Sequence, residues 1–198
     1  ITTNDKEIYE KLILHRVHGM HKNNINFVNH KYAFDEKNNP NRWYYEMSHL
    51  GYNYRITDLQ AAIGIEQLKK LKSFVNKRRR IAEIYNITLK DNPYIQIFRN
   101  NKYTYNVYHL FTILIDFKKI KKSRNKVMSE LLSQGIGTQV LYIPVHKQPF
   151  YKKKVNNNLV LNNAENYYEK CLSIPIYPSL KISDVKKISK IINKVVSL

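Results

Sequence analysis

The sequence predicts an α/β protein in which one long helix leads from an irregular N-terminal region into a small layered C-terminal domain. From Thr57 to about Leu89, apolar residues recur at helical spacing and no proline interrupts them. After Pro93, segments rich in β-branched and aromatic residues alternate with helical segments, in the order strand, helix, strand, helix. This order is typical of helices that pack on a sheet.

The first element is a helix predicted at residues 4–17. Asn4 is expected to cap this helix, with Glu7 three residues later, as a capping box requires. Gly19 follows the helix, and we expect it to end the helix in a left-handed turn, because glycine adopts that conformation without strain.

Residues 20–42 form the next segment, which is rich in Asn and Lys and predicts a long irregular loop. Loops of this length in compact domains are often functional or mobile. The long helix then begins at Thr57, which forms a second capping box with Gln60. Asp58 lies in the first turn of that helix, where the helix dipole favours a negative charge.

The C-terminal half follows a break at residues 90–104, and we place the domain boundary at residue 92, which divides the chain into residues 1–92 and 93–198. Turn residues and hydrophobic periodicity predict the elements of this half. They are strands at 108–117 and 138–145, helices at 123–134 and 163–172, an extended segment at 173–178, and a last helix that Ser183 caps.

The composition is strongly basic, with 34 Lys and Arg against 15 Asp and Glu and a formal net charge of +19 over 198 residues. However, Lys, Asn and Ile occur 26, 23 and 23 times, and these amino acids share AT-rich codons, so genome composition accounts for the bias. Arg, whose planar fork grips phosphate in two places, occurs only 8 times. The run Lys77 to Arg80 lies inside a helical pattern and predicts a solvated charged face, so nucleic-acid binding is a weaker interpretation.

Other function classes are disfavoured by the same counts. The single cysteine, Cys171, rules out a disulfide within the chain, and we expect a buried, inert thiol in a helical segment. The longest apolar runs, such as residues 110–115, are far shorter than a membrane span, which favours a soluble cytoplasmic protein. His15, His18 and His21 are spaced by three, but neither carboxylate nor cysteine accompanies them, so we expect no metal site.

Residues 43–58 carry the first unusual combination, because the segment contains five aromatic side chains together with Asn53 and Arg55 just before a helix start. Alternate residues of an extended stretch face the same side. Asn53 and Arg55 could therefore converge on one anion beside the helix N-terminus, a natural position for a phosphate. A capping and packing role for this segment stays open.

Residues 142–151 carry the second combination, in which a predicted strand runs into a proline-bounded turn with Tyr142, His146 and Tyr151. Such a rim suits hydrogen bonding to a sugar or stacking on a base. The alternative is an ordinary loop with one exposed histidine.

Together these segments resemble the DegT/DnrJ/StrS family of sugar aminotransferases, which use pyridoxal 5′-phosphate on the fold-type I scaffold. Residues 51–64 resemble the family's signature after its lysine, and residues 16–19 resemble the turn that precedes it. Residues 142–146 resemble a strand of the small domain, and residues 172–178 the closing segment. The match covers nearly the whole chain in the family's order.

The resemblance implies that residues 1–92 are the end of a large cofactor-binding domain with its long inter-domain helix, and that residues 93–198 are the small C-terminal α/β domain. The family's Ser-x-His-x-x-Lys-like motif, whose lysine forms the Schiff base with the cofactor, has no copy in this sequence. It would fall upstream of residue 1, with most of the parallel sheet. The resemblance therefore implies the C-terminal part of a homodimeric enzyme, inactive alone.

It also implies the reaction: glutamate donates its amine to a UDP-4-keto-6-deoxy-hexose and leaves as 2-oxoglutarate, in the synthesis of pseudaminic acid or a related cell-surface sugar. Asn53 would bind the cofactor phosphate in the partner's site, and Arg55 an anionic group of the donor or of the nucleotide sugar. Tyr142, His146 and Tyr151 would line the nucleotide-sugar side. A non-catalytic remnant or interaction module is the alternative, and a basic nucleic-acid-binding protein is the third interpretation.

Overall fold

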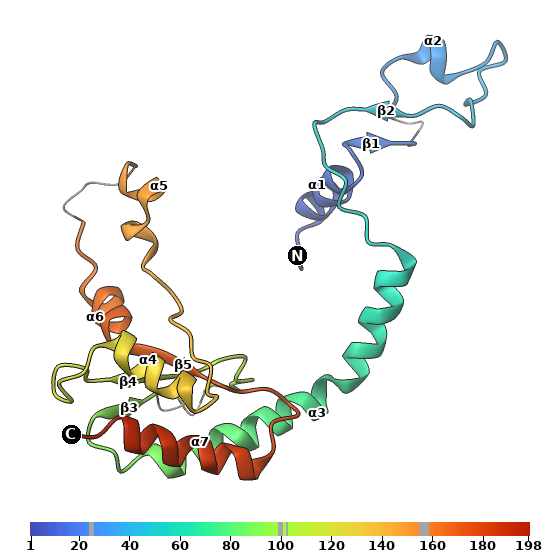
Figure 1. Cartoon of the computed structure of the whole chain (residues 1–198). Coiled ribbons are helices and arrows are strands. Elements are labelled where there is room, and N and C mark those ends of the chain that lie inside the picture. Colours follow the sequence, from blue (N-terminus) through green and yellow to red (C-terminus); the bar gives the residue numbers. More distant parts are fainter. Residues whose placement is uncertain (24–25, 99–100, 102, 155–158) are drawn as a thin grey trace. The chain divides into compact units, whose positions relative to one another are not determined.

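A computed structural model describes the chain except for residues 24–25, 99–100, 102 and 155–158 (Figure 1). The chain divides into two compact units, residues 1–68 and 69–198, and each is described by itself below. The border between the units falls within a single long helix. The division into family domains at residue 92 stays a prediction.

Helix α1 (Lys6–Arg16) opens the first unit. The predicted cap, Asn4, is wrong by one residue, because the side chain of Asp5 accepts the hydrogen bond from the backbone N–H of Ile8 at 3.1 Å. Gly19 ends the helical stretch as predicted: its φ is 70°, and its N–H donates to a carbonyl of the last turn at 2.9 Å. The sequence therefore sets both ends of this helix through short local contacts.

The described part of residues 20–42 is largely irregular, as predicted, but it contains two short elements. Strand β1 (Met20–His21) pairs antiparallel with strand β2 (Glu46–Met47), and helix α2 (His30–Ala33) forms a single turn between them. Residues 24–25 of the predicted loop lie outside the described residues.

Helix α3 (Asp58–Leu89) runs without a break for 32 residues, as the sequence predicts. The capping box forms as expected: the N–H of Thr57 donates to Oε1 of Gln60 at 3.0 Å, and the N–H of Gln60 donates to Oγ1 of Thr57 at 3.3 Å. Only the C-terminal half of the helix reaches a core, through the buried side chains of Ile81, Ala82, Tyr85 and Leu89.

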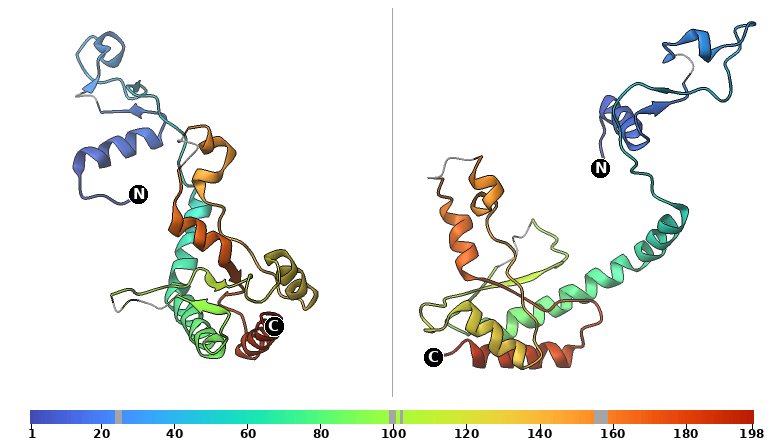
Figure 2. Two further views of the ribbon diagram at one scale, coloured as in Figure 1. Left: turned by 90° about the vertical axis from the view of Figure 1, so that its left-hand side faces the viewer. Right: turned by 45° about the horizontal axis from the view of Figure 1, so that its top comes forward.

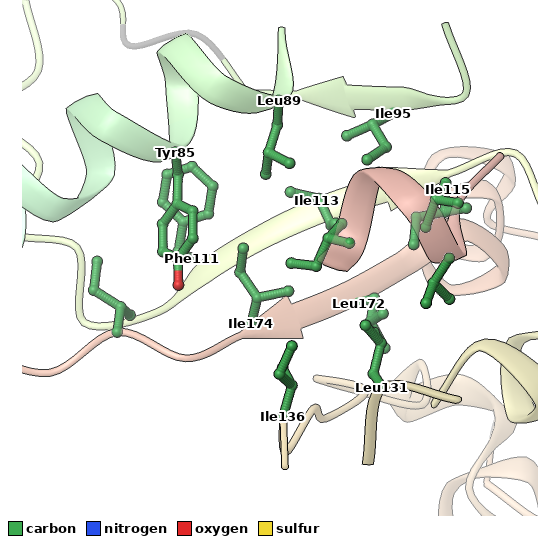
Figure 3. Close-up of a cluster of buried hydrophobic side chains, with 14 of the residues drawn as sticks. Tyr85, Leu89, Ile95, Phe111, Ile113, Ile115, Leu131, Ile136, Leu172 and Ile174 are labelled. Carbon is green, nitrogen blue, oxygen red and sulfur yellow. The ribbon is translucent and has the colours of Figure 1, made fainter. Parts of the chain in front are cut away.

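The second unit is built on an antiparallel sheet in the order β3-β4-β5, which comprises Ile95–Ile97, Phe111–Ile115 and Cys171–Ile174. In the central strand, alternate side chains are buried, namely Phe111, Ile113 and Ile115. Figure 3 shows these side chains in one cluster with Tyr85 and Leu89 of α3 and with Leu131 of helix α4 (Arg124–Ser133).

The strand predicted at 108–117 is confirmed as β4, but one predicted strand and one predicted helix end are wrong in this region. Residues 138–145 do not form a strand: only an isolated bridge joins Gln139 to Ser173, and Val145 already begins the short helix η2 (Val145–Lys147). Strand β5 begins two residues early: Cys171 and Leu172 belong to the predicted helix, whereas residues 173–174 lie in the predicted extended segment. Cys171 is buried, as predicted, but it lies in β5, because pairing with β4 overrides local helical preference.

The remaining helices lie close to their predicted positions. Helix α4 (Arg124–Ser133) is capped by Ser123, as predicted, and Gly135 follows it with a φ of 76°. Ser183 is not the cap of the last helix, because that helix already starts at Ile182 after Lys181. The bounds are α5 Pro149–Lys152, α6 Asn162–Lys170 and α7 Ile182–Val195. Figure 2 shows these three helices in orange to red.

A polar seam joins α3 to α7 beside the apolar core. Oγ1 of Thr88 donates to Oγ of Ser189 at 2.8 Å, and Nδ2 of Asn193 donates to the carbonyl of Thr88 at 2.9 Å. Nδ2 of Asn92 donates to Oδ1 of Asn193 at 3.1 Å. These bonds fix the position of α7 along α3, since a shift would leave part-buried polar groups unpaired.

None of the helices in the described residues combines the length and the apolar character that crossing a lipid bilayer requires.

Candidate functional site

The segment that precedes α3 is held in place by the end of α1. The N–H of Tyr52 donates to the carbonyl of His15 at 2.7 Å, and the N–H of His18 donates to the carbonyl of Tyr52 at 2.9 Å. The N–H of Tyr54 donates to the carbonyl of Arg16 at 3.0 Å. The segment is therefore a fixed, extended stretch before the helix start.

Two glycines allow this close approach of the chain to itself. A Cβ atom on Gly51 would lie 2.2 Å from the backbone nitrogen of Gly19, and one on Gly19 would lie 1.7 Å from the carbonyl oxygen of His49. Both distances are far below van der Waals contact, so neither position accepts a side chain unless the backbone moves.

Asn53 and Arg55 lie on the same side of this stretch, as the alternation predicts. Nε of Arg55 donates to Oδ1 of Asn53 at 3.3 Å, while the rings of Tyr52 and Tyr54 stack with centroids 5.2 Å apart. All four residues are exposed. Among the residues that the structure describes, none pairs with the Asn53 amide nitrogen or with the terminal guanidinium nitrogens of Arg55, so these donors are available beside the start of α3.

Glu46 organises the loop region of the first unit, a role that sequence reasoning missed. Its carboxylate accepts hydrogen bonds from the N–H of Val28 at 2.8 and 3.0 Å and from the N–H of Asn29 at 2.7 Å. The hydroxyl of Tyr44 adds a third donor at 2.8 Å. These bonds, chiefly those from Val28 and Asn29, hold the pKa of Glu46 below its ordinary value. The partners are 17 and 18 residues away, which no local pattern reveals.

The three residues predicted on the nucleotide-sugar side, all in the second unit, differ in exposure. The Tyr142 and Tyr151 residues are 71% and 45% exposed, whereas the His146 side chain is only 9% exposed. Tyr151 packs edge-on against Phe150, with ring centroids 5.2 Å apart. Within the described part of the chain, no hydrogen bond or ring contact joins Tyr142, His146 and Tyr151 directly, so the structure places them on one segment without bringing their side chains together.

His146 pairs instead with Glu165 of α6, which the sequence did not single out. Nε2 of His146 lies 3.0 Å from Oε1 of Glu165, and Nζ of Lys147 lies 2.5 Å from Oε2. The N–H of Leu161 also donates to Oε1 at 3.3 Å. The hydrogen bond from Lys147, followed by that from His146, lowers the pKa of Glu165 from its ordinary 4.5 to about 2. Glu165 is 19 residues from His146 in sequence, so only the fold reveals the pair.

The basic run on α3 is engaged within the second unit. Nη1 of Arg78 donates to three backbone carbonyls, those of Tyr108, His109 and Ile176, at 3.0, 3.1 and 2.9 Å. Nε of Arg79 donates to the carbonyl of Asn106 at 2.8 Å, and its guanidinium lies over the ring of Tyr105. The prediction of a solvated charged face is therefore wrong for these two arginines, and the run offers fewer free cations to a nucleic acid than the sequence suggests.

The described residues contain no group of three or more His, Cys, Asp or Glu side chains that could hold a metal ion. Cys171 is buried, and desolvation raises the pKa of its thiol, which disfavours the reactive thiolate.

The fold defines a class of protein. The structure matches that of Helicobacter pylori PseC, described as an aminotransferase involved in the biosynthesis of pseudoaminic acid, with a TM-score of 0.82 and 29% identity. The match covers 98% of this chain and 47% of that one, and the fold is part of a fold-type I pyridoxal-phosphate aminotransferase. The chain belongs to the DegT/DnrJ/EryC1/StrS aminotransferase family, whose model matches residues 1–193.

Curated relatives agree with this family. The chain is 36% identical over 198 residues to an uncharacterised protein of Methanocaldococcus jannaschii, covering all of this chain and 49% of the relative. It is 33% identical over 186 residues to the UDP-4-amino-4,6-dideoxy-N-acetyl-beta-L-altrosamine transaminase of Campylobacter jejuni, covering 94% of this chain and 44% of that enzyme. The chain thus spans about half the length of the curated relatives it matches. The resemblance and the partial fold-type I architecture inferred from the sequence are confirmed.

Proposed function

We propose that this chain is the C-terminal part of a nucleotide-sugar aminotransferase that moves the amino group of glutamate to a UDP-4-keto-6-deoxy-hexose, in the synthesis of pseudaminic acid or a related cell-surface sugar. The observation that carries the proposal is the pairing of Asn53 and Arg55 on a fixed stretch beside the start of α3. Family membership and the names of the relatives support the reaction class. The homodimer and the cytoplasmic location stay predictions.

The donors before α3 suit the phosphate of pyridoxal phosphate. The amide of Asn53 offers neutral N–H donors, the guanidinium of Arg55 offers a charged fork, and the segment that carries them is held by three backbone hydrogen bonds. In our proposal, Asn53 binds the cofactor phosphate in the site of a second copy, and Arg55 orients the carboxylate of the amino donor or a phosphate of the nucleotide sugar. When bound, the cofactor supplies the electron sink of the reaction.

The segment 142–151 would supply the nucleotide-sugar side. The exposed rings of Tyr142 and Tyr151 offer flat apolar faces for a base or a sugar ring. His146 offers a ring nitrogen for a sugar hydroxyl. The proton-transferring lysine would come from a segment encoded before Ile1.

The first test is the DNA sequence directly 5′ of the Ile1 codon. The proposal expects an in-frame segment with a Ser-x-His-x-x-Lys-like motif. The protein encoded with that segment is expected to aminate a UDP-4-keto-6-deoxy-hexose at the expense of glutamate. A motif-free upstream sequence, or a longer protein that leaves every UDP-4-keto sugar unchanged, would contradict the proposal.

Site variants of the same longer protein test the roles of the donor pair. Asn53→Ala is expected to weaken cofactor binding by about tenfold, the loss of one or two hydrogen bonds to a charged group. Arg55→Met is expected to raise KM for glutamate or for the nucleotide sugar by a similar factor. Lys72→Met, an exposed lysine of α3, serves as the matched control and is expected to change neither value.

A non-catalytic interaction module is the second candidate, and one observation favours it. The first part of α3 exposes large apolar side chains in the described structure, including Leu59, Ile63, Leu68 and Leu71 at 52–73% exposure. Surfaces of this kind usually meet a partner. Size-exclusion chromatography distinguishes the candidates: a stable, monodisperse complex of the 198-residue chain with an endogenous partner, combined with no lysine motif upstream, would favour the module.

A further inference from the structure

Glu165 occupies a central position behind the proposed nucleotide-sugar side. Its two carboxylate oxygens engage consecutive residues of η2: Oε1 is 3.0 Å from Nε2 of His146, and Oε2 is 2.5 Å from Nζ of Lys147. The same Oε1 accepts the N–H of Leu161, just before α6. One side chain of α6 therefore ties down the turn that carries His146.

The contact determines which nitrogen of His146 carries a proton. An ionised carboxylate accepts hydrogen bonds but cannot donate them, so Nε2 must be the donor at this contact. The low pKa of Glu165 keeps its carboxylate ionised at neutral pH. In the neutral imidazole the other nitrogen, Nδ1, then has a free lone pair and can accept a hydrogen bond.

The burial of the pair makes this arrangement persistent. The side chain of His146 is 9% exposed and that of Glu165 is 22% exposed, whereas that of Lys147 is 42% exposed. Water therefore competes less for the His146 contact than for the Lys147 contact. Because the two contacts differ in exposure, substitutions can test the contribution of His146 and that of Lys147 separately.

We propose that Glu165 is a positioning residue for sugar recognition: it holds His146 as the Nε2–H tautomer against α6, so that Nδ1 accepts a hydrogen bond from a hydroxyl of the nucleotide sugar. The proposal rests on the proposed function, because it assigns a residue to that enzyme's sugar side. It gives Glu165 no contact with substrate, and its effect passes through His146.

The first experiment observes the ring proton directly in the 198-residue chain. The Nε2–H proton of His146, held by a carboxylate and shielded from water, is expected to give an exchange-protected proton NMR signal near neutral pH. The signal is assigned by its loss in His146→Gln. We expect it to disappear in Glu165→Ala and to persist in Lys147→Met, the matched control. Absence of the signal in the unchanged chain, or its persistence in Glu165→Ala, would overturn the proposal.

The second experiment uses the longer, active protein and separates the two half-reactions. Glu165→Ala is expected to raise KM for the UDP-4-keto sugar about tenfold, with the glutamate half-reaction unchanged. Glu165→Gln retains an acceptor for Nε2–H, so its KM for the sugar should stay within about threefold of the original value. Lys147→Met leaves the contact between Glu165 and His146 in place, so its KM should also stay within about threefold. In a Glu165→Ala background, His146→Ala should add little further loss, since both changes remove the same contact.

The outcomes distinguish this inference from the proposed function. A longer protein that never aminates a UDP-4-keto sugar contradicts both. An active protein in which Glu165→Ala leaves KM for the sugar unchanged, or raises the KM values of both substrates equally, contradicts only the positioning role. Thermal unfolding of each variant, followed by circular dichroism, shows whether a changed KM comes with a folded protein.

Discussion

At the scale of single residues, charged side chains of this protein stabilise loops by binding backbone groups. The guanidinium of Arg78 collects three carbonyls from two separate segments, and the carboxylate of Glu46 collects the N–H groups of two consecutive residues. Hydrogen bonds with an ionised partner are stronger than neutral ones, and removing the ion leaves several backbone groups unsatisfied at once. Such residues resemble surface charges in the sequence but act as structural anchors.

Arg78→Met should therefore destabilise the chain by about 2–3 kcal/mol, because three carbonyls lose a charged donor. Arg80→Met is the matched control two positions later, since Arg80 is exposed and should change stability by less than about 0.5 kcal/mol. Urea unfolding measures both values. Equal effects of the two substitutions would refute the anchoring role.

Gly51→Ala should destabilise the first unit by about 1–3 kcal/mol, because the added Cβ would lie 2.2 Å from the backbone nitrogen of Gly19. Gly64→Ala, inside α3 and with nothing within 4 Å of its added Cβ, should instead stabilise the helix by about 0.5–1 kcal/mol. Thermal unfolding of the two variants of this chain should give shifts of opposite sign. A shift of the same sign would contradict the close crossing of the chain at Gly51.

Glu165 should also make the free energy of unfolding depend on pH in the acidic range. Its pKa is lowered in the folded chain from 4.5 to about 2, so its contribution is present above pH 4.5 and is lost as pH falls from about 4.5 to 2. Glu165→Gln has no such titration, and the stability difference between the original chain and this variant should shrink over that interval. Denaturant unfolding at a series of pH values measures it, and a constant difference would contradict the ion pair with Lys147.

At the scale of elements, the sequence predicts the central strand β4 and the helices that have local signals, but it misses or misplaces the outer strands β3 and β5. The capping box at Thr57, the cap at Ser123 and the left-handed turn at Gly19 all form as predicted. Strand β3 lies in a predicted break, and β5 lies partly in a predicted helix, because both gain their order from pairing with β4.

In the candidate site, too, the sequence predicts local arrangements but not contacts between distant residues. The shared side of Asn53 and Arg55 follows from the two-residue period of an extended chain, and the sequence predicted it. The contacts of His146 with Glu165 and of Glu46 with the loop at Val28 join residues 17–19 positions apart through tertiary structure. The sequence pattern around any one of these residues could not reveal such contacts.

Helix α4 offers a direct test of the core. Leu131 is fully buried, whereas its neighbour Leu132 is 67% exposed. Leu131→Ala should cost about 2–5 kcal/mol, the loss of a buried side chain plus the cavity left behind, and Leu132→Ala should cost less than about 0.5 kcal/mol. Urea unfolding compares the two. A similar cost at both positions would show that α4 packs on the sheet through another face.

At the scale of the whole molecule, a net charge of +19 coexists with arginines that are already committed to the fold. The remaining charge consists mainly of lysines spread along the chain, which attract polyanions without reading sequence. Charge alone is therefore a poor guide to the function of this protein.

This distribution predicts weak, unselective binding of nucleic acid. Fluorescence anisotropy with labelled duplex DNA should show binding at low salt that falls steeply with added salt, by roughly 10³-fold or more between 50 and 200 mM if six or more phosphates are contacted. Unrelated duplexes should bind equally. Binding that survives 200 mM salt and prefers one sequence would revive the nucleic-acid interpretation.

The polar seam between α3 and α7 also has a consequence for synthesis of the chain. Its bonds join residues 101 to 105 positions apart, with Thr88 translated long before Ser189 and Asn193. At about 5–20 residues per second, a ribosome needs roughly 5–20 s to add the intervening stretch. During that delay the apolar cluster around Tyr85 and Leu89 is incomplete, because the residues of α7 that belong to it have not yet been synthesised. A premature stop codon before Ile182 would produce a chain that lacks α7 and never completes this cluster, and chaperones and proteases would then act on it.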